Sequence, residues 1–144
     1  MKKKRYMLDT NICSFIMRGS PPSVREAMHA ALKQKHECVI SAIVYMEMRL
    51  GAHNPKAPAG LHQKIDRFLQ SVDVLPYDKA AVDASGIVYA QLARQRQLIG
   101  GHDVSIAGHC IAEGCILVTN NTREFARVEG LEIEDWVHYP ASNT

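Results

Sequence analysis

The chain has 144 residues, of which 47% are hydrophobic and 22% are charged, and its formal net charge is +2 at pH 7. This length suits one domain with its own apolar core, and the composition excludes a largely disordered chain and one that needs disulfides to fold. So small a net charge does not identify a nucleic-acid-binding protein. Four of the first five residues are nevertheless basic, and this run fits a solvated terminus and a contact to phosphate equally well.

The four cysteines are predicted to be reduced core residues. Cys13, Cys38, Cys110 and Cys115 each lie in or beside an apolar run, and no two of them form the C-x-x-C pair expected of a zinc site. The apolar stretch after the basic N-terminus ends at Asp9, which is too early for a signal peptide. No other apolar run is long enough to span a bilayer. We therefore expect a cytoplasmic protein.

Short apolar runs typical of strands alternate with segments of helical periodicity. Strands are predicted at residues 5–9, 38–41 and 115–119, with one short edge strand within 131–140. Helices are predicted from just past Asp9, from Pro22 to about Lys35, from Ala42 to Leu50, over 61–72, from after Asp78 towards Arg96, and from about Asp103 to Gly114. This alternation predicts an α/β fold in which helices wrap a parallel sheet.

The third predicted helix has clear signals at both ends. Ser41 directly follows a predicted strand and has the side chain of an N-cap. Gly51 is expected to end the helix, because glycine is favoured just beyond helix C-termini. Residues 51–60 contain two prolines and two glycines, and they are expected to form a loop within the domain.

Two carboxylates occupy informative positions. Asp9 ends the first strand, at the edge of a parallel sheet where open α/β folds bind ligands, although it is equally suited to cap the next helix. Glu47 is spaced from Ile43 and Leu50 so that it falls on the stripe expected to face the core. A buried carboxylate needs a partner, a proton or a cation, and Arg49 is expected to point elsewhere. This pattern favours a cation or a cleft.

A third carboxylate and a polar run complete the pattern. Asp103 lies at a predicted helix start, where free N–H groups favour a negative side chain, and Gly100 and Gly101 would allow close approach of another group. Residues 119–122 offer uncharged oxygens at another strand end, which turn formation explains as well. Each signal alone is weak. Together they predict an oxygen-rich pocket suited to Mg²⁺ or Mn²⁺.

The strings YMLDTNIC, SAIVYMEM, GGHDVSIAGH and LVTNNTREF, in this order, resemble the PIN-domain ribonucleases, and specifically the VapC toxins of bacterial toxin-antitoxin pairs. LDTN and TNNTREF are the most specific parts, and the resemblance covers the chain from about Lys4 to Trp136. It implies one PIN domain over residues 1–144, folded as a three-layer α/β/α sandwich around a mainly parallel sheet, with a C-terminal tail over 137–144.

The resemblance also implies roles for individual residues. Asp9, Glu47 and Asp103 correspond to the acidic metal ligands of the family. Asn121 stands where many relatives have a fourth Asp, so the catalytic group would be these three acids with Asn121, and the number of bound metal ions stays open. The expected neighbours of the site or of the substrate are Thr10, Asn11, Thr119, Asn120 and Arg123.

The function implied is that of a toxin endoribonuclease. It would hydrolyse phosphodiester bonds of tRNA or another structured RNA with water activated by Mg²⁺ or Mn²⁺, and a VapB-type antitoxin would hold it inactive. Kinship further implies a homodimer that reaches operator DNA only through the antitoxin. The alternative is a non-catalytic interaction protein whose acidic pocket binds a basic segment of a partner. A metal-free histidine mechanism is disfavoured, because His109 is expected to be satisfied within its helix.

Overall fold

The computed structural model describes residues 2–139, in which a five-stranded sheet is flanked by seven helices. The strands are β1 (Arg5–Leu8), β2 (Glu37–Ser41), β3 (Asp73–Leu75), β4 (Ile116–Val118) and β5 (Ile133–Glu134). The helices are α1 (Thr10–Arg18), α2 (Pro22–Lys33), α3 (Ala42–His53), α4 (Leu61–Phe68), α5 (Lys79–Arg94), α6 (Gly101–Ala112) and α7 (Thr122–Phe125).

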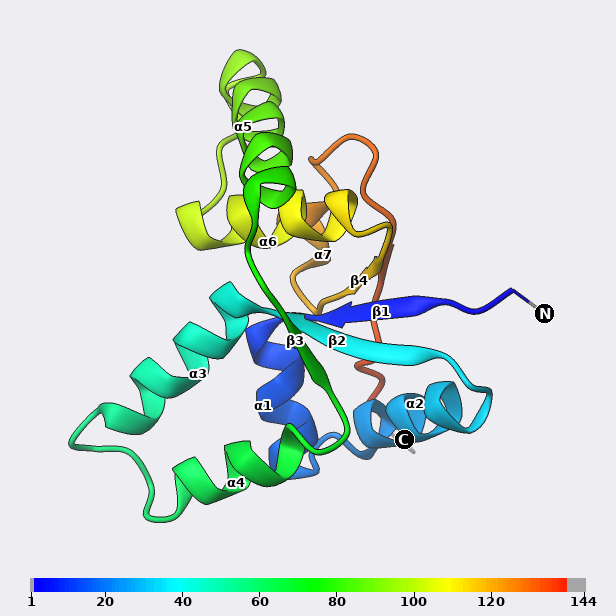
Figure 1. Cartoon of the computed structure of the whole chain (residues 1–144), viewed down its shortest axis with the longest axis vertical. Coiled ribbons are helices and arrows are strands. Elements are labelled where there is room, and N and C mark those ends of the chain that lie inside the picture. Colours follow the sequence, from blue (N-terminus) through cyan, green and yellow to red (C-terminus); the bar gives the residue numbers. More distant parts are fainter. Residues whose placement is uncertain (1, 140–144) are drawn as a thin grey trace, which may run out of the picture.

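Every strand pair in the described part of the chain is parallel, and the strand order is β3-β2-β1-β4-β5. Helices α5 and α6 lie on one side of the sheet, whereas α1, α2 and α4 lie on the other (Figure 1). The central strand β1 is buried from both sides, and Met7 and Leu8 have no exposed surface. The predicted α/β sandwich with a parallel sheet is therefore confirmed.

Three helices begin at side-chain caps, which satisfy backbone N–H groups that have no partner within the helix. The carboxylate of Asp9 accepts from the N–H of Ile12 at 2.9 Å at the start of α1. Ser41 accepts from the N–H of Ile43 at 3.1 Å at the start of α3. Asp78 caps α5 in the same way. The predicted starts of these three helices, including the cap at Ser41, are confirmed.

Two predicted helix ends are wrong. Helix α3 continues through Gly51 to His53, because an exposed glycine inside a helix costs only about 1 kcal/mol. The helix stops before Pro55, which disfavours helical geometry in the residue preceding it. Helix α4 ends at Phe68 rather than at residue 72.

Strand β3, which follows α4, was not predicted. Its three residues are mostly exposed at one edge of the sheet, so they lack the apolar alternation that reveals a strand. Strand β5 lies at the opposite edge and confirms the short strand expected within 131–140. Of the predicted C-terminal tail, Val137 is buried against the core, and residues 140–144 lie outside the described residues.

All four cysteines are free and buried, as predicted. None of the helices within residues 2–139 combines the length and the apolar character needed to cross a lipid bilayer.

Candidate active site

Two predicted site residues, and the cap of the helix that carries Glu47, lie at the carboxyl ends of three neighbouring strands. Asp9 comes directly after β1, Ser41 is the last residue of β2, and Thr119 comes directly after β4. Because the strands are parallel, their carboxyl ends all lie at the same end of the sheet. The connection after β1 runs to β2 on one side, and the connection after β4 runs to β5 on the other, so the two diverge between β1 and β4, which is where open α/β sheets bind ligands.

Asp9 is the most buried carboxylate of the site, with 6% of its surface exposed. Burial raises its pKa to about 6, and the negative charges of Asp103 and Glu47 add to this rise. Hydrogen bonds from the Thr119 side chain and the Ile12 backbone oppose it. The cap considered for Asp9 from the sequence is therefore confirmed, and the residue is also close enough to two other acids to be influenced by their charges.

The raised pKa of Asp9 predicts a pH-dependent stability of the metal-free protein. Since its folded-state pKa of about 6 exceeds the ordinary 3.8, this group's stabilising contribution is complete below about pH 4 and is lost as the pH rises through 6. Asp9→Asn keeps a capping oxygen and removes the charge, so it should stabilise the metal-free protein at pH 8 by on the order of 3 kcal/mol. Urea unfolding in EDTA at pH 4 and pH 8 measures this; an equal effect at both would contradict it.

Glu47 contacts two residues from other helices. Thr10 Oγ1 donates to its Oε1 at 2.8 Å, and Nδ1 of His102 lies 3.5 Å from its Oε2. The Glu47 side chain is 28% exposed, whereas the fully core-facing residues of α3 are Val44 and Met48.

The predicted core stripe through Glu47 is thus only partly right. Leu50, taken as one of its members, is 60% exposed, so Glu47 lies at the margin of the buried face. Arg49 points elsewhere, as expected: its guanidinium donates to the hydroxyl of Tyr45 and to the carboxylate of Asp66.

Asp103 is the third residue of α6, whose N-cap is Gly100. Burial raises the pKa of Asp103, the charges of Glu47 and Glu124 raise it further, and His102 opposes the rise. The two glycines before Asp103 are not required by close contacts within residues 2–139. Neither glycine has a positive φ. A Cβ built on Gly100 would lie 3.7 Å from Oδ2 of Asp103, and a Cβ built on Gly101 would have no atom within 4 Å.

Glu124 is a fourth carboxylate, which the sequence analysis missed. The side-chain amide of Asn121 donates to its Oε2 at 3.1 Å, and its charge acts on Asp103. Asn121 therefore reaches the acids through Glu124. The signal was present in the sequence, because Glu124 follows Asn121 by three residues, which is one turn of the short helix α7.

The remaining predicted residues divide into two groups. Thr10 bonds Glu47, and Thr119 is fully buried, bonds Asp9 and accepts from the backbone N–H of Asn121. Asn120 instead donates to Asp135 at 3.0 Å. Asn11 and Arg123 are exposed.

The donor set fits a hard divalent cation, because carboxylate, amide and hydroxyl oxygens are the ligands such ions prefer. Burial and mutual repulsion already raise the pKa values of Asp9 and Asp103, and a cation relieves both effects. Within residues 2–139, however, no group of three Asp, Glu, His or Cys side chains is arranged to hold a metal ion as it stands. Glu47 is instead engaged by Thr10 and His102.

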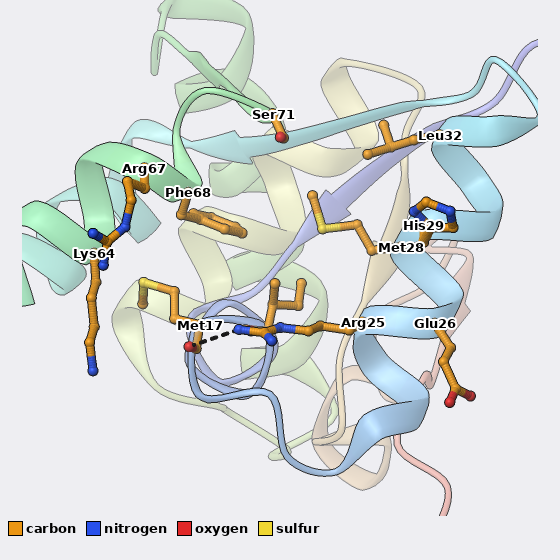
Figure 2. A pocket seen from close by; sticks show the side chains of 11 residues that line it. Met17, Arg25, Glu26, Met28, His29, Leu32, Lys64, Arg67, Phe68 and Ser71 are labelled. Carbon is orange, nitrogen blue, oxygen red and sulfur yellow. Dashed lines mark hydrogen bonds between the residues drawn. The ribbon is translucent and has the colours of Figure 1, made fainter.

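A cavity of about 630 Å³ lies away from these acids. It lies between α1, α2 and α4, where Met28 and Phe68 face one another across it and Arg25 donates to the carbonyl of Met17 (Figure 2). Its floor is apolar, and Lys64 and Arg67 stand at its rim.

Known proteins match the chain over nearly its whole length. The PIN domain family matches residues 6–131. A tRNA(fMet)-specific endonuclease VapC from Shigella flexneri is 46% identical over 132 residues, covering 92% of this chain and 98% of that protein. A protein of the same name from Salmonella typhimurium is 39% identical over the same shares.

Solved structures agree. VapBC2 from Rickettsia felis, bound to a DNA fragment from its promoter, matches with a TM-score of 0.86 and 32% identity, over 92% of this chain and 99% of that chain. DNA-bound VapBC from Salmonella typhimurium matches with a TM-score of 0.84 and 38% identity, over 93% and 99%. The chain therefore belongs to the PIN-domain family and, within it, to the VapC ribonucleases.

Proposed function

We propose that this chain is a toxin endoribonuclease that cuts tRNA with the help of Mg²⁺ or Mn²⁺ and is held inactive by a VapB-type antitoxin. The observation that carries the proposal is the gathering of Asp9, Glu47, Asp103 and Glu124 at the edge where β1 and β4 end. The charges of neighbouring acids raise the pKa values of Asp9 and Asp103 in the metal-free protein, and a bound cation would offset this repulsion.

The residues of the site would have separate roles in metal binding and in RNA contact. Asp9, Glu47 and Asp103 hold the ion, and Asn121 keeps Glu124 directed towards the same group. When bound, the ion supplies an activated water and neutralises charge on the phosphate that is cut. Arg123 is exposed on α7 beside Glu124, where it is suited to contact a backbone phosphate of the RNA.

The assay uses purified toxin, freed of antitoxin, with initiator and elongator methionine tRNAs as separate substrates. The names of the relatives from Shigella and Salmonella support initiator tRNA as the preferred one. We expect cleavage with Mg²⁺ or Mn²⁺, none in EDTA, and recovery when Mn²⁺ is restored in excess. Products with a 5′-phosphate and a 3′-hydroxyl are expected.

The same assay separates catalysis from the alternative of a non-catalytic interaction protein. An interaction protein would leave both tRNAs intact under every metal condition, and the proposed activity would then fail. Cleavage that persists in EDTA would instead refute only the role of the metal.

We propose that the antitoxin docks an amphipathic acidic segment in the cavity between α1, α2 and α4. Ile16, Met28 and Phe68 give the cavity an apolar floor. Lys64 and Arg67 at its rim are exposed and form no ion pair within residues 2–139. Apolar residues flanked by acidic ones complement this lining.

The double substitution Lys64→Glu with Arg67→Glu is expected to weaken antitoxin binding roughly tenfold or more, because it replaces attraction by repulsion. Titration calorimetry with the cognate antitoxin measures the change, and RNA cleavage by the free variant should be unchanged. Lys79→Glu with Arg94→Glu on α5 reverses the same number of charges on the other side of the sheet. If both double substitutions weakened antitoxin binding equally, the effect would come from net charge and the proposed docking of the antitoxin in this cavity would be wrong.

Three expectations from kinship join this proposal. Residues 1–144 form one PIN domain with a core over about 4–136. The toxin forms a homodimer, which sedimentation analysis tests, and operator DNA is bound through the antitoxin. The reaction takes place in the cytoplasm, which agrees with four free thiols.

A further inference from the structure

A fully buried histidine connects the two helices that carry Glu47 and Asp103. Nδ1 of His109, on α6, lies 2.8 Å from Oγ of Ser41 in a buried hydrogen bond. The same Ser41 oxygen accepts from the N–H of Ile43 and so caps α3. The first turn of α3 is therefore fixed to the last turn of α6 through one side chain.

A histidine at this buried position destabilises the fold relative to an apolar side chain of similar size. Its Nε2 is buried and forms no hydrogen bond of good geometry within the described residues, and an unsatisfied buried nitrogen is destabilising. Burial lowers the pKa of His109, and the opposing influences of the Glu113 and Asp78 charges and of the Pro76 backbone do not reverse this. Leucine would fill similar space without this penalty, but it would lose the bond to Ser41.

Helix α6 is also fixed against α5 next to His109. Gly108 packs so closely on Ser85 that no Cβ fits between the helices. The hydroxyl of Ser85 donates to the carbonyl of Ala81, and Tyr77 donates to Ser85 while its ring meets the His109 ring edge-on at 5.4 Å. Helix α6 is thus held by both α5 and the start of α3.

The link is close to both acids along the chain. Asp103 precedes His109 by six residues on α6, and Glu47 follows Ser41 by six residues on α3. Six helical residues span about 9 Å. Since helices are stiff over this length, a shift of α6 against α3 at the His109–Ser41 bond changes how Asp103 and Glu47 face each other.

We propose that His109 is a positioning residue of the active site, whose bond to Ser41 sets the relative placement of Asp103 and Glu47 for metal binding. The inference rests on the proposed function, because it concerns the same metal site.

The test compares two substitutions of His109 with a control. His109→Leu removes the bond to Ser41, whereas His109→Asn retains a polar atom near the position of Nδ1. Val24→Ala opens a buried site on α2, which carries none of the acids. For each variant we would measure Mn²⁺ affinity by electron paramagnetic resonance of free Mn²⁺, kcat and KM for tRNA cleavage, and the thermal midpoint.

We expect His109→Leu to lower Mn²⁺ affinity and kcat by about 10- to 100-fold with KM nearly unchanged, as is usual when a group that orients metal ligands is lost. His109→Asn should recover most of both. Val24→Ala should keep both despite a similar loss of thermal stability. Wild-type Mn²⁺ affinity and kcat in His109→Leu, or equal losses in Val24→Ala, would overturn the proposal.

If His109→Leu does not fold, Ser41→Ala provides the same test from the other end, since it removes the hydroxyl and keeps the imidazole. Wild-type Mn²⁺ affinity in Ser41→Ala would then overturn the proposal. Failure of the proposed function is separately visible, because in that case the wild-type protein itself would show neither Mn²⁺ binding nor cleavage.

Discussion

Replacing Asp9 by Asn is expected to lower kcat for RNA cleavage by at least about 10³-fold, because loss of a ligand charge removes several kcal/mol of metal-dependent stabilisation of the transition state. Asp103→Asn should have an effect of similar size. Both substitutions keep the shape of the side chain, and the amide introduced by Asp9→Asn still offers an oxygen to the N–H of Ile12. Single-turnover cleavage of labelled tRNA measures the loss.

Stability separates this prediction from simple misfolding. Metal-free Asp9→Asn should be more stable than the wild type at pH 8, because burial raises the pKa of Asp9 to about 6. A variant that is more stable than the wild type and yet inactive has lost a group needed for catalysis and has not lost its fold. Asp73→Asn, at an exposed carboxylate on β3, is the matched control and should retain full activity. Wild-type cleavage by either Asp9→Asn or Asp103→Asn would remove that residue from the site.

Gly108→Ala is expected to destabilise the protein by about 3 kcal/mol or more, although alanine favours helices. A Cβ at this position would lie 2.5 Å from the backbone Cα and N atoms of Ser85. Because the obstacle is backbone, α5 and α6 would have to separate. Such a loss is a large share of the roughly 5–15 kcal/mol that typically separates folded from unfolded domains. Urea unfolding measures the change.

Gly86→Ala is the matched control for this prediction. Gly86 lies on the exposed side of α5, and nothing lies within 4 Å of a Cβ built there. The same chemical change should therefore stabilise the protein by about 0.5–1 kcal/mol. Destabilisation of similar size by both substitutions would show that the close packing of Gly108 on Ser85 does not decide the outcome.

The alternation of strands and helices could be predicted because its signals are local. Caps such as Ser41 and Asp78 are single residues that satisfy N–H groups of their own helix, so the chain shows them directly. Strand β3 and the continuation of α3 through Gly51 could not be predicted in this way. The first depends on pairing with a strand distant in the chain, and the second on a glycine cost too small to end a helix.

For the site, the sequence determined the chemical types: carboxylates at Asp9, Glu47 and Asp103, at the ends or starts of elements. That these three lie near one another, with Glu124 beside them, was decided by the tertiary structure. The parallel strand order brings the carboxyl ends of β1 and β4 together. It also brought His109 against Ser41, 68 residues apart in the chain. Local signals cannot encode such contacts, because they depend on how distant helices pack across one sheet.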